Sequence, residues 1–190
     1  MVKGRELKDI AVSALLLAFA FSIAMSGGIY AELSEITTTL PSALLGVSLG
    51  FIFHELGHRF TARRYGCFAQ YQMWMGGLLL ALGCSLLGFV FAAPGAVMIY
   101  QGVRGLTYRS EGIISMAGPS ANLVLSLMFG ILNFFCPAYV FELGAYINAL
   151  LALFNLIPFS ILDGAKIFRW NKGVWLAGVA AGVVLLWWIF

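Results

Sequence analysis

The chain has 190 residues, of which 62% are hydrophobic and only 10% charged, and its mean hydropathy is +0.95. Soluble domains carry about 25% charged residues, so a soluble fold of this size could not bury so much apolar surface. The net charge of +3 comes from basic residues that apolar segments separate, which excludes a nucleic-acid-binding surface. We therefore expect an all-α polytopic membrane protein that contacts the lipid bilayer and binds no nucleic acid.

The first apolar segment, 10–29, is uncharged and long enough to span a bilayer. A cleaved signal peptide is the competing interpretation, but its apolar part is typically shorter. We therefore predict a retained helix in a multi-pass protein of the cell membrane. The basic residues that precede it predict a cytoplasmic N-terminus by the positive-inside rule: Lys3, Arg5 and Lys8.

The second segment, 41–65, is predicted to have Pro41 in its first turn. It contains the sequence HELGH at 54–58, with the only two histidines of the chain. Two histidines four residues apart share one helix face, which is the spacing that allows both to bind one metal ion. The segment ends on the basic residues Arg59, Arg63 and Arg64, so the motif is expected inside the bilayer near its cytoplasmic edge.

Residues 66–111 allow two interpretations. Short strands are possible at 68–74 and 96–100, and the apolar stretch 73–93 is interrupted by four glycines and ended by Pro94. This stretch is either a full span or a re-entrant segment. We favour a re-entrant or short β segment after the HExxH helix, because it leaves all eleven lysines and arginines, including Arg104 and Arg109, on the cytoplasmic side.

Three more apolar segments follow at 112–135, 138–158 and 173–190, which gives about five to six transmembrane helices. We expect a single domain over 1–190, with a core at about 40–170 and no soluble accessory domain.

A catalytic zinc site has three protein ligands and one open position, so the two histidines need a partner. The candidates are Asp163, Glu142 or a cysteine. Glu142 is predicted on the far side of the membrane. Asp163 is predicted at the depth of the histidines, near the cytoplasmic end of its helix, because a basic cluster follows it: Lys166, Arg169 and Lys172.

Three motifs in this order, HELGH at 54–58, GPSAN at 118–122 and NLIPFSILDG at 155–164, resemble the site-2 protease family of intramembrane zinc metalloproteases (peptidase family M50). The resemblance implies one Zn²⁺ ion per chain, with His54, His58 and Asp163 as its ligands and Glu55 as the catalytic general base. The family motif usually ends in LDGG, whereas Ala165 stands at the last position here.

Asn122 and Asn155 are isolated amides in apolar segments, where a polar group needs a partner. One interpretation is that they hold the substrate backbone or stabilise the oxyanion. The other is that they form hydrogen bonds between helices.

We expect an intramembrane zinc endopeptidase that cleaves transmembrane protein substrates within or near the cytoplasmic side of the bilayer. The alternatives are a non-proteolytic membrane zinc-binding protein, such as a carrier, and an inactive family member that binds membrane proteins. Ionisable residues cluster at one depth instead of following a path through the bilayer, which argues against a carrier. The presence of Glu55 argues against an inactive protein.

Overall fold

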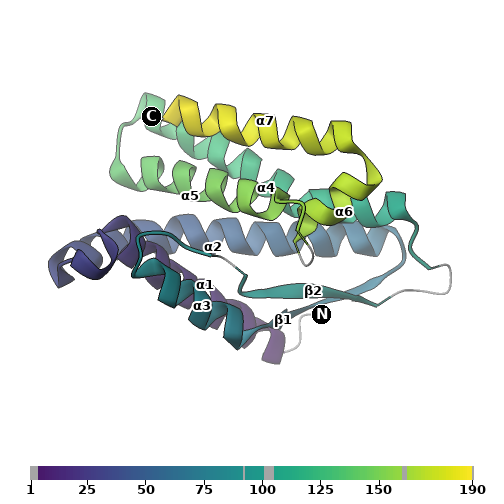
Figure 1. Ribbon diagram of the computed structural model, residues 1–190, viewed down its shortest axis with the longest axis horizontal. Helices are drawn as coiled ribbons and strands as arrows, with labels where there is room; N and C mark the ends of the chain where they lie inside the picture. The colour runs from purple at the N-terminus through teal and green to yellow at the C-terminus, as the bar shows by residue number, and fades with distance from the viewer. Residues whose placement is uncertain (1–3, 92, 101–104, 160–161, 190) are drawn as a thin grey trace.

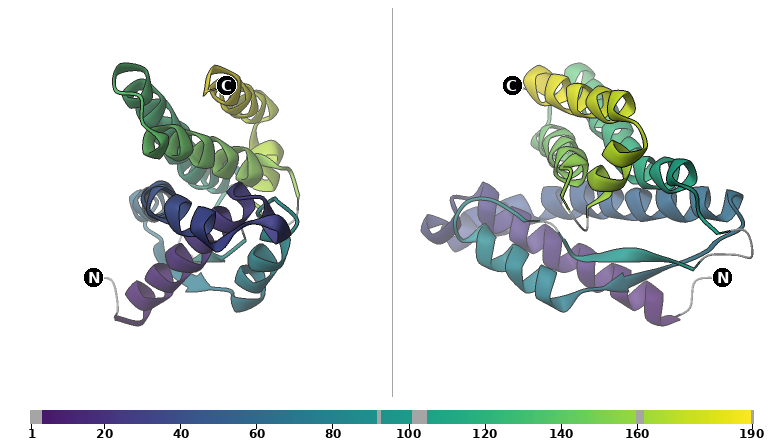
Figure 2. Two further views of the ribbon diagram at one scale, coloured as in Figure 1. Left: turned by 90° about the vertical axis from the view of Figure 1, so that its left-hand side faces the viewer. Right: turned by 45° about the vertical axis from the view of Figure 1, so that its right-hand side comes forward.

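The computed structural model describes residues 4–91, 93–100, 105–159 and 162–189. Helix α2 (Leu33–Arg64) is central, and two groups of elements lie on either side of it (Figures 1 and 2). One group consists of α4 (Tyr108–Phe135), α5 (Tyr139–Leu156), α6 (Asp163–Trp170) and α7 (Lys172–Ile189). The other consists of α1 (Gly4–Met25), β1 (Phe68–Met73), α3 (Met75–Ser85) and β2 (Gly95–Tyr100). A short 3-10 helix, η1 (Gly28–Tyr30), follows α1. Lys3 and Arg104, which entered the topology prediction, lie outside the described residues.

Five helices in the described part of the chain, α1, α2, α4, α5 and α7, are long and apolar enough to cross a membrane. Their lengths range from 18 to 32 residues, and a helix needs about 20 residues to cross a bilayer. The predicted class, an all-α polytopic membrane protein with a short β segment, is therefore confirmed.

The predicted start of the second helix is wrong. Helix α2 begins at Leu33, so Pro41 lies inside it and not in its first turn. Glu32 and Glu35 form a capping box at the start of α2, in which each side chain accepts a hydrogen bond from the other residue's backbone N–H. This local pairing satisfies free donors at the helix end and fixes the start eight residues earlier than expected.

The segment between α2 and α4 follows the re-entrant path. Helix α3 has 11 residues and rises about 16 Å, much less than the hydrocarbon core of about 30 Å. Its end lies beside η1, where Ile29 N–H donates to the Leu86 carbonyl (2.8 Å). The chain then returns to β2, which pairs antiparallel with β1 so that Phe68 lies opposite Tyr100. Both predicted strands are present, and the segment leaves and returns at one end of the molecule (Figure 1).

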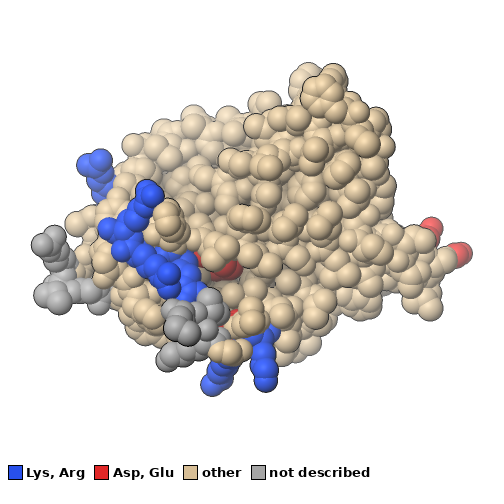
Figure 3. Space-filling view, turned by 180° about the vertical axis from the view of Figure 1, so that it is seen from behind, with Lys and Arg blue, Asp and Glu red and all other residues tan. Residues whose placement is uncertain are grey.

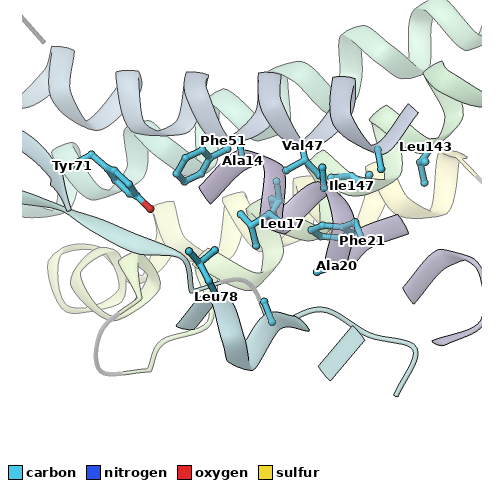
Figure 4. Close-up of a cluster of buried hydrophobic side chains, with 14 residues drawn as sticks. Ala14, Leu17, Ala20, Phe21, Val47, Phe51, Tyr71, Leu78, Leu143 and Ile147 are labelled. Carbon is cyan, nitrogen blue, oxygen red and sulfur yellow. The ribbon is translucent and has the colours of Figure 1, made fainter. Parts of the chain in front are cut away.

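Apolar side chains from α1, α2, α3, α5 and β1 meet in one buried cluster (Figure 4). Tyr71 of β1 lies at its edge, and its ring packs edge-on against Phe51 of α2, with 5.3 Å between ring centres. The Tyr71 hydroxyl donates to the Pro94 carbonyl (3.0 Å) and lies 2.9 Å from the Ser13 hydroxyl. Tyr71 therefore ties the β1–β2 hairpin to both α1 and α2.

Helices α2 and α5 approach closely at two glycines of α2. A Cβ atom added to Gly46 would lie 3.1 Å from the Cα atom of Gly144, and one added to Gly50 would overlap the side-chain oxygen of Asn148. Small residues of this kind allow helix backbones to come together in a membrane. The contact places polar side chains of α5 directly against α2.

Candidate metal centre

Three donor atoms from two helices converge on one point. His54 and His58 lie one turn apart on α2, and Asp163 is the first residue of α6. The His54 and His58 Nε2 atoms are 3.0 Å apart, and Asp163 Oδ2 lies 3.0 Å from His58 Nε2 and 3.5 Å from His54 Nε2. Tetrahedral zinc with bonds of about 2.0–2.2 Å places its donors about 3.3–3.6 Å apart. The three atoms therefore fit one zinc ion.

The element that carries Asp163 differs from the prediction. Helix α5 ends at Leu156, before Pro158, and Asp163 begins a separate helix instead of lying at the end of the preceding one. Proline disfavours helical backbone in the residue before it, which explains the break. Asp163, the first residue of α6, nevertheless lies beside both histidines.

Hydrogen bonds on the far side of each ring orient both histidines. His58 Nδ1 lies 2.8 Å from the Ile114 carbonyl, and His54 Nδ1 lies 2.6 Å from Asn122 Oδ1. Since oxygen atoms accept in both pairs, each Nδ1 carries the proton and each Nε2 is left with a free lone pair. Two such lone pairs only 3.0 Å apart repel each other unless a cation lies beside them both.

Gly118 of α4 leaves the space beside these two nitrogens open. A Cβ atom at this position would overlap His58 Nε2 and lie 2.6 Å from His54 Nε2. Helices α2 and α4 also approach closely here, because a Cβ atom on Gly57 would lie 2.8 Å from the Ala117 carbonyl oxygen. The GPSAN motif therefore gives the site room that any larger residue would fill.

Glu55 is buried beside the donor set. Its Oε2 atom is buried and has no hydrogen-bond partner among the described residues. Glu55 lines a cavity of about 420 Å³, whose wall includes all three donor residues and β2 residues 95–99. A carboxylate that lines a cavity together with a metal-binding set is suited to take a proton from a water molecule.

The charge of Asp163 is set by its neighbours. Burial alone would raise the pKa of the Asp163 carboxyl, but the positive charge of a protonated imidazole at His58 or His54 outweighs burial and holds that pKa below its ordinary value. A metal ion beside the same nitrogens acts in the same direction, so Asp163 is ionised, as a metal ligand must be. Lys166 lies one turn further along α6, with its Nζ 4.0 Å from Asp163 Oδ1.

The two predicted asparagines have different surroundings. Asn122 is fully buried, and its Nδ2 donates to the Gly50 carbonyl (3.1 Å) and to Asn148 Oδ1 (3.1 Å). Together with the bond to His54, these are the contacts expected of an interhelical residue. Asn155 is half-buried and lines the cavity, and its Nδ2 donates to the Leu151 carbonyl (2.9 Å).

Asn148 was missed in the sequence. It is fully buried and donates to the Gly46 carbonyl (3.1 Å) and the Gly144 carbonyl (2.9 Å) while accepting from Asn122. The signal that singled out Asn122 and Asn155, an amide isolated in an apolar segment, applies to Asn148 as well.

The fold and the site together define a class of protein: a multi-pass helical membrane protein with an HExxH motif that fits zinc. The chain is 38% identical over 177 residues to the protein named "Putative zinc metalloprotease MJ0611" from Methanocaldococcus jannaschii, and the match covers 90% of this chain and 87% of that protein. The chain belongs to this family of zinc metalloproteases, in agreement with its resemblance to the site-2 proteases, and zinc is the metal of the family.

Two further relatives carry the same description. Rip2 of Mycolicibacterium smegmatis is 30% identical over 64% of this chain and 53% of its own length. Rip3 of Mycobacterium tuberculosis is 32% identical over 61% of this chain and 27% of its own length. No family model matches the chain. No solved structure matches it significantly.

Proposed function

We propose that the chain is an intramembrane endopeptidase that hydrolyses peptide bonds of transmembrane protein substrates near the cytoplasmic side of the bilayer. The observation that carries the proposal is the place of the site in the sequence of α2. His54, Glu55 and His58 lie within a helix apolar enough to span, a few residues before its basic end at Arg63 and Arg64. A soluble substrate would not enter the bilayer to this depth.

In this proposal His54, His58 and Asp163 hold the ion, and Asn122 keeps the His54 ring in place. Bound zinc supplies Lewis-acid chemistry, since it makes a water molecule more acidic and polarises a carbonyl group. Glu55 takes a proton from the attacking water. As the water oxygen bonds to the carbonyl carbon and the C–N bond breaks, Glu55 delivers that proton to the leaving amine. Asn155 lines the cavity, and we propose that the second N–H of its amide donates to the substrate backbone while the first donates to the Leu151 carbonyl.

The free edge of β2 supports an extended substrate. A transmembrane helix hides its peptide bonds in its own hydrogen bonds, so the substrate has to unwind locally before cleavage. Strand β2 pairs only with β1 among the described residues, and residues 95–99 line the cavity. The backbone groups on the other edge of β2 can pair with an unwound substrate strand.

The charge distribution supports a cytoplasmic N-terminus. Lysine and arginine side chains gather toward one end of the molecule, and the acidic side chains at the opposite end belong near the start of α2 (Figure 3). The positive-inside rule assigns the basic end to the cytoplasm. The metal-binding set lies toward this end, so cleavage is proposed on the cytoplasmic side.

The decisive experiment measures zinc and cleavage in the same preparations. Wild-type protein in detergent is expected to hold about one zinc ion and to cut a model transmembrane substrate. Glu55→Gln should keep zinc but lose about 10²–10⁴-fold in kcat, because general-base catalysis contributes that much. Asp163→Asn should lose zinc.

The matched control is Glu142→Gln, which removes an exposed carboxylate on α5. Full cleavage by Glu55→Gln would contradict the mechanism, and zinc binding without any cleavage by the wild type would favour a non-proteolytic zinc protein.

A further inference from the structure

Lys166 is the single lysine or arginine among the described residues that line the metal-site cavity. Its side chain is 35% exposed, and its Nζ lies 4.0 Å from Asp163 Oδ1, which is too long for a hydrogen bond. The other oxygen of that carboxylate faces the two histidines. Lys166 therefore has only a loose ion pair, and its partner, the Asp163 carboxylate, also faces the metal-binding histidines.

Neighbouring cations are better paired. Arg59 forms a 2.9 Å ion pair with Glu6, and Arg169 forms a 2.7 Å ion pair with Glu111. Each of these arginines has a carboxylate that faces no metal-binding group. Lys166 differs because it shares its carboxylate with the metal-binding set.

With a divalent metal ion bound, the charges around the cavity would leave an excess of one positive charge. The ion would balance the two carboxylates, Glu55 and Asp163, and the two imidazoles that hold it would be neutral. The charge of Lys166 then has no counterpart among the described lining residues. Much of the wall is apolar, so a charge there is screened less than on an open surface. An anionic group is the chemical complement of this position.

The position of Lys166 limits where this anion lies on a substrate. The Lys166 Nζ lies 4.0 Å from one oxygen of Asp163, and the other oxygen faces the two histidines. An extended peptide advances about 3.3 Å per residue, so an acidic residue that reaches Lys166 is expected about two or three residues from a peptide bond at the metal-binding set. We propose that Lys166 selects substrates with an aspartate or glutamate about two or three residues from the scissile bond. A lysine ammonium acts as a point charge without a fixed geometry, so either acid suits it. This inference rests on the proposed protease function, because it assigns that site a substrate preference.

Binding, measured without turnover, tests the preference. Zinc-loaded wild-type protein is titrated with fluorescent apolar peptides in detergent, and affinity is read by anisotropy. A neutral ketomethylene group replaces the central peptide bond, so the peptides are not cleaved and Glu55 keeps its charge. One glutamate is moved through the four positions on either side of the central bond, with glutamine as its matched replacement. We expect glutamate to bind about 10-fold more tightly than glutamine at one or two positions, a factor that corresponds to about 1.4 kcal/mol.

Variants of Lys166 in the same assay decide its role. Lys166→Gln should remove the preference, Lys166→Arg should keep it, and Lys166→Glu should reverse it toward a peptide with lysine at that position. Lys172→Gln is the matched control, because Lys172 is exposed, stacks on Phe168 and is absent from the cavity wall. Zinc content should stay unchanged in Lys166→Gln.

Three outcomes would overturn the inference: equal affinity for both peptides at every position, a preference that survives Lys166→Gln, or loss of zinc from Lys166→Gln, which would make Lys166 a support for Asp163. Its failure is separable from failure of the protease proposal. A wild-type protein that cleaves the model substrate while the peptides bind equally leaves the protease proposal intact. A preference for the acidic peptides without cleavage of the model substrate would support the role of Lys166 and contradict the protease proposal.

Discussion

Gly118 shows how a residue without a side chain shapes the metal centre. We expect Gly118→Ala to weaken zinc binding by about 10- to 100-fold, because overpacking costs about 1–3 kcal/mol and the added methyl would overlap the two metal-facing nitrogens. Competition with a chelator measures the affinity. Gly83→Ala is the control, since a Cβ atom at Gly83 meets nothing within 4 Å. Equal zinc affinity of both variants would show that the backbone of α4 yields easily.

Asn122 acts on zinc through the ring of His54. Its removal in Asn122→Ala leaves His54 Nδ1 without its partner and should weaken zinc binding by about 10- to 100-fold, as is usual for residues that orient a metal ligand. Asn148→Ala should have a smaller effect on zinc, because Asn148 contacts Asn122 and not the histidine. A chelator titration that ranks Asn148→Ala as the worse binder would contradict this order.

The three predicted metal ligands lie together in the structure, whereas the contacts that support them were not predicted. The spacing of His54 and His58 requires only helix periodicity, and Asp163 follows from a motif and a depth argument. The partners of Asn122 and the need for Gly118 depend on how α2, α4 and α5 approach one another. Such contacts join residues 26 to 72 positions apart, and no local pattern encodes them.

Among the elements, α1, α2 and β1 are joined by a buried ion pair that the sequence did not reveal. The predicted basic end of the second helix included Arg59, yet Arg59 is buried beside Glu6, whose Oε1 also accepts from the Tyr71 N–H (3.1 Å). Two of the guanidinium nitrogens, Nε and Nη2, lack partners in the described structure. Glu6 is thus the main compensation for a buried charge next to a metal-binding histidine.

We expect Glu6→Gln to lower the free energy of unfolding by about 3–5 kcal/mol, because it leaves the Arg59 charge buried and uncompensated. The matched variant Glu111→Gln breaks a partly exposed pair with Arg169 and should cost about 0–1 kcal/mol. Denaturant titration in mixed micelles compares the two. Equal destabilisation would mean that water reaches Arg59.

Element type was easier to predict than element boundaries. Glycines and Pro94 indicated correctly that residues 73–93 do not form a normal span, and the two short strands were found. The start of α2 and the separate helix α6 were not predicted. A capping box at Glu32 determines where α2 begins. Pro158 ends α5 early, so that Asp163 can begin a separate helix.

At the level of the whole molecule, the site brings distant segments to one depth. Helix α2 gives both histidines and Glu55, α6 gives Asp163, and α4 packs against both helices. On the other side of α2, the β1–β2 hairpin forms part of the cavity wall. The re-entrant path matters here because it lets the hairpin reach the cavity without a full crossing, which would have reversed the orientation of every later helix.

That orientation gives the last prediction. In intact cells, a membrane-impermeant thiol reagent should label Cys136, which is exposed in the link between α4 and α5, because this link is proposed to face outward. Arg109→Cys in a Cys136→Ser background should react only after the cells are opened, since exposed Arg109 lies near the start of α4 at the proposed cytoplasmic end. The Cys136→Ser protein without a new cysteine gives the background, because Cys67 is buried and Cys84 is half-buried. Labelling of Arg109→Cys from outside would place the metal centre at the opposite face and with it the proposed site of cleavage.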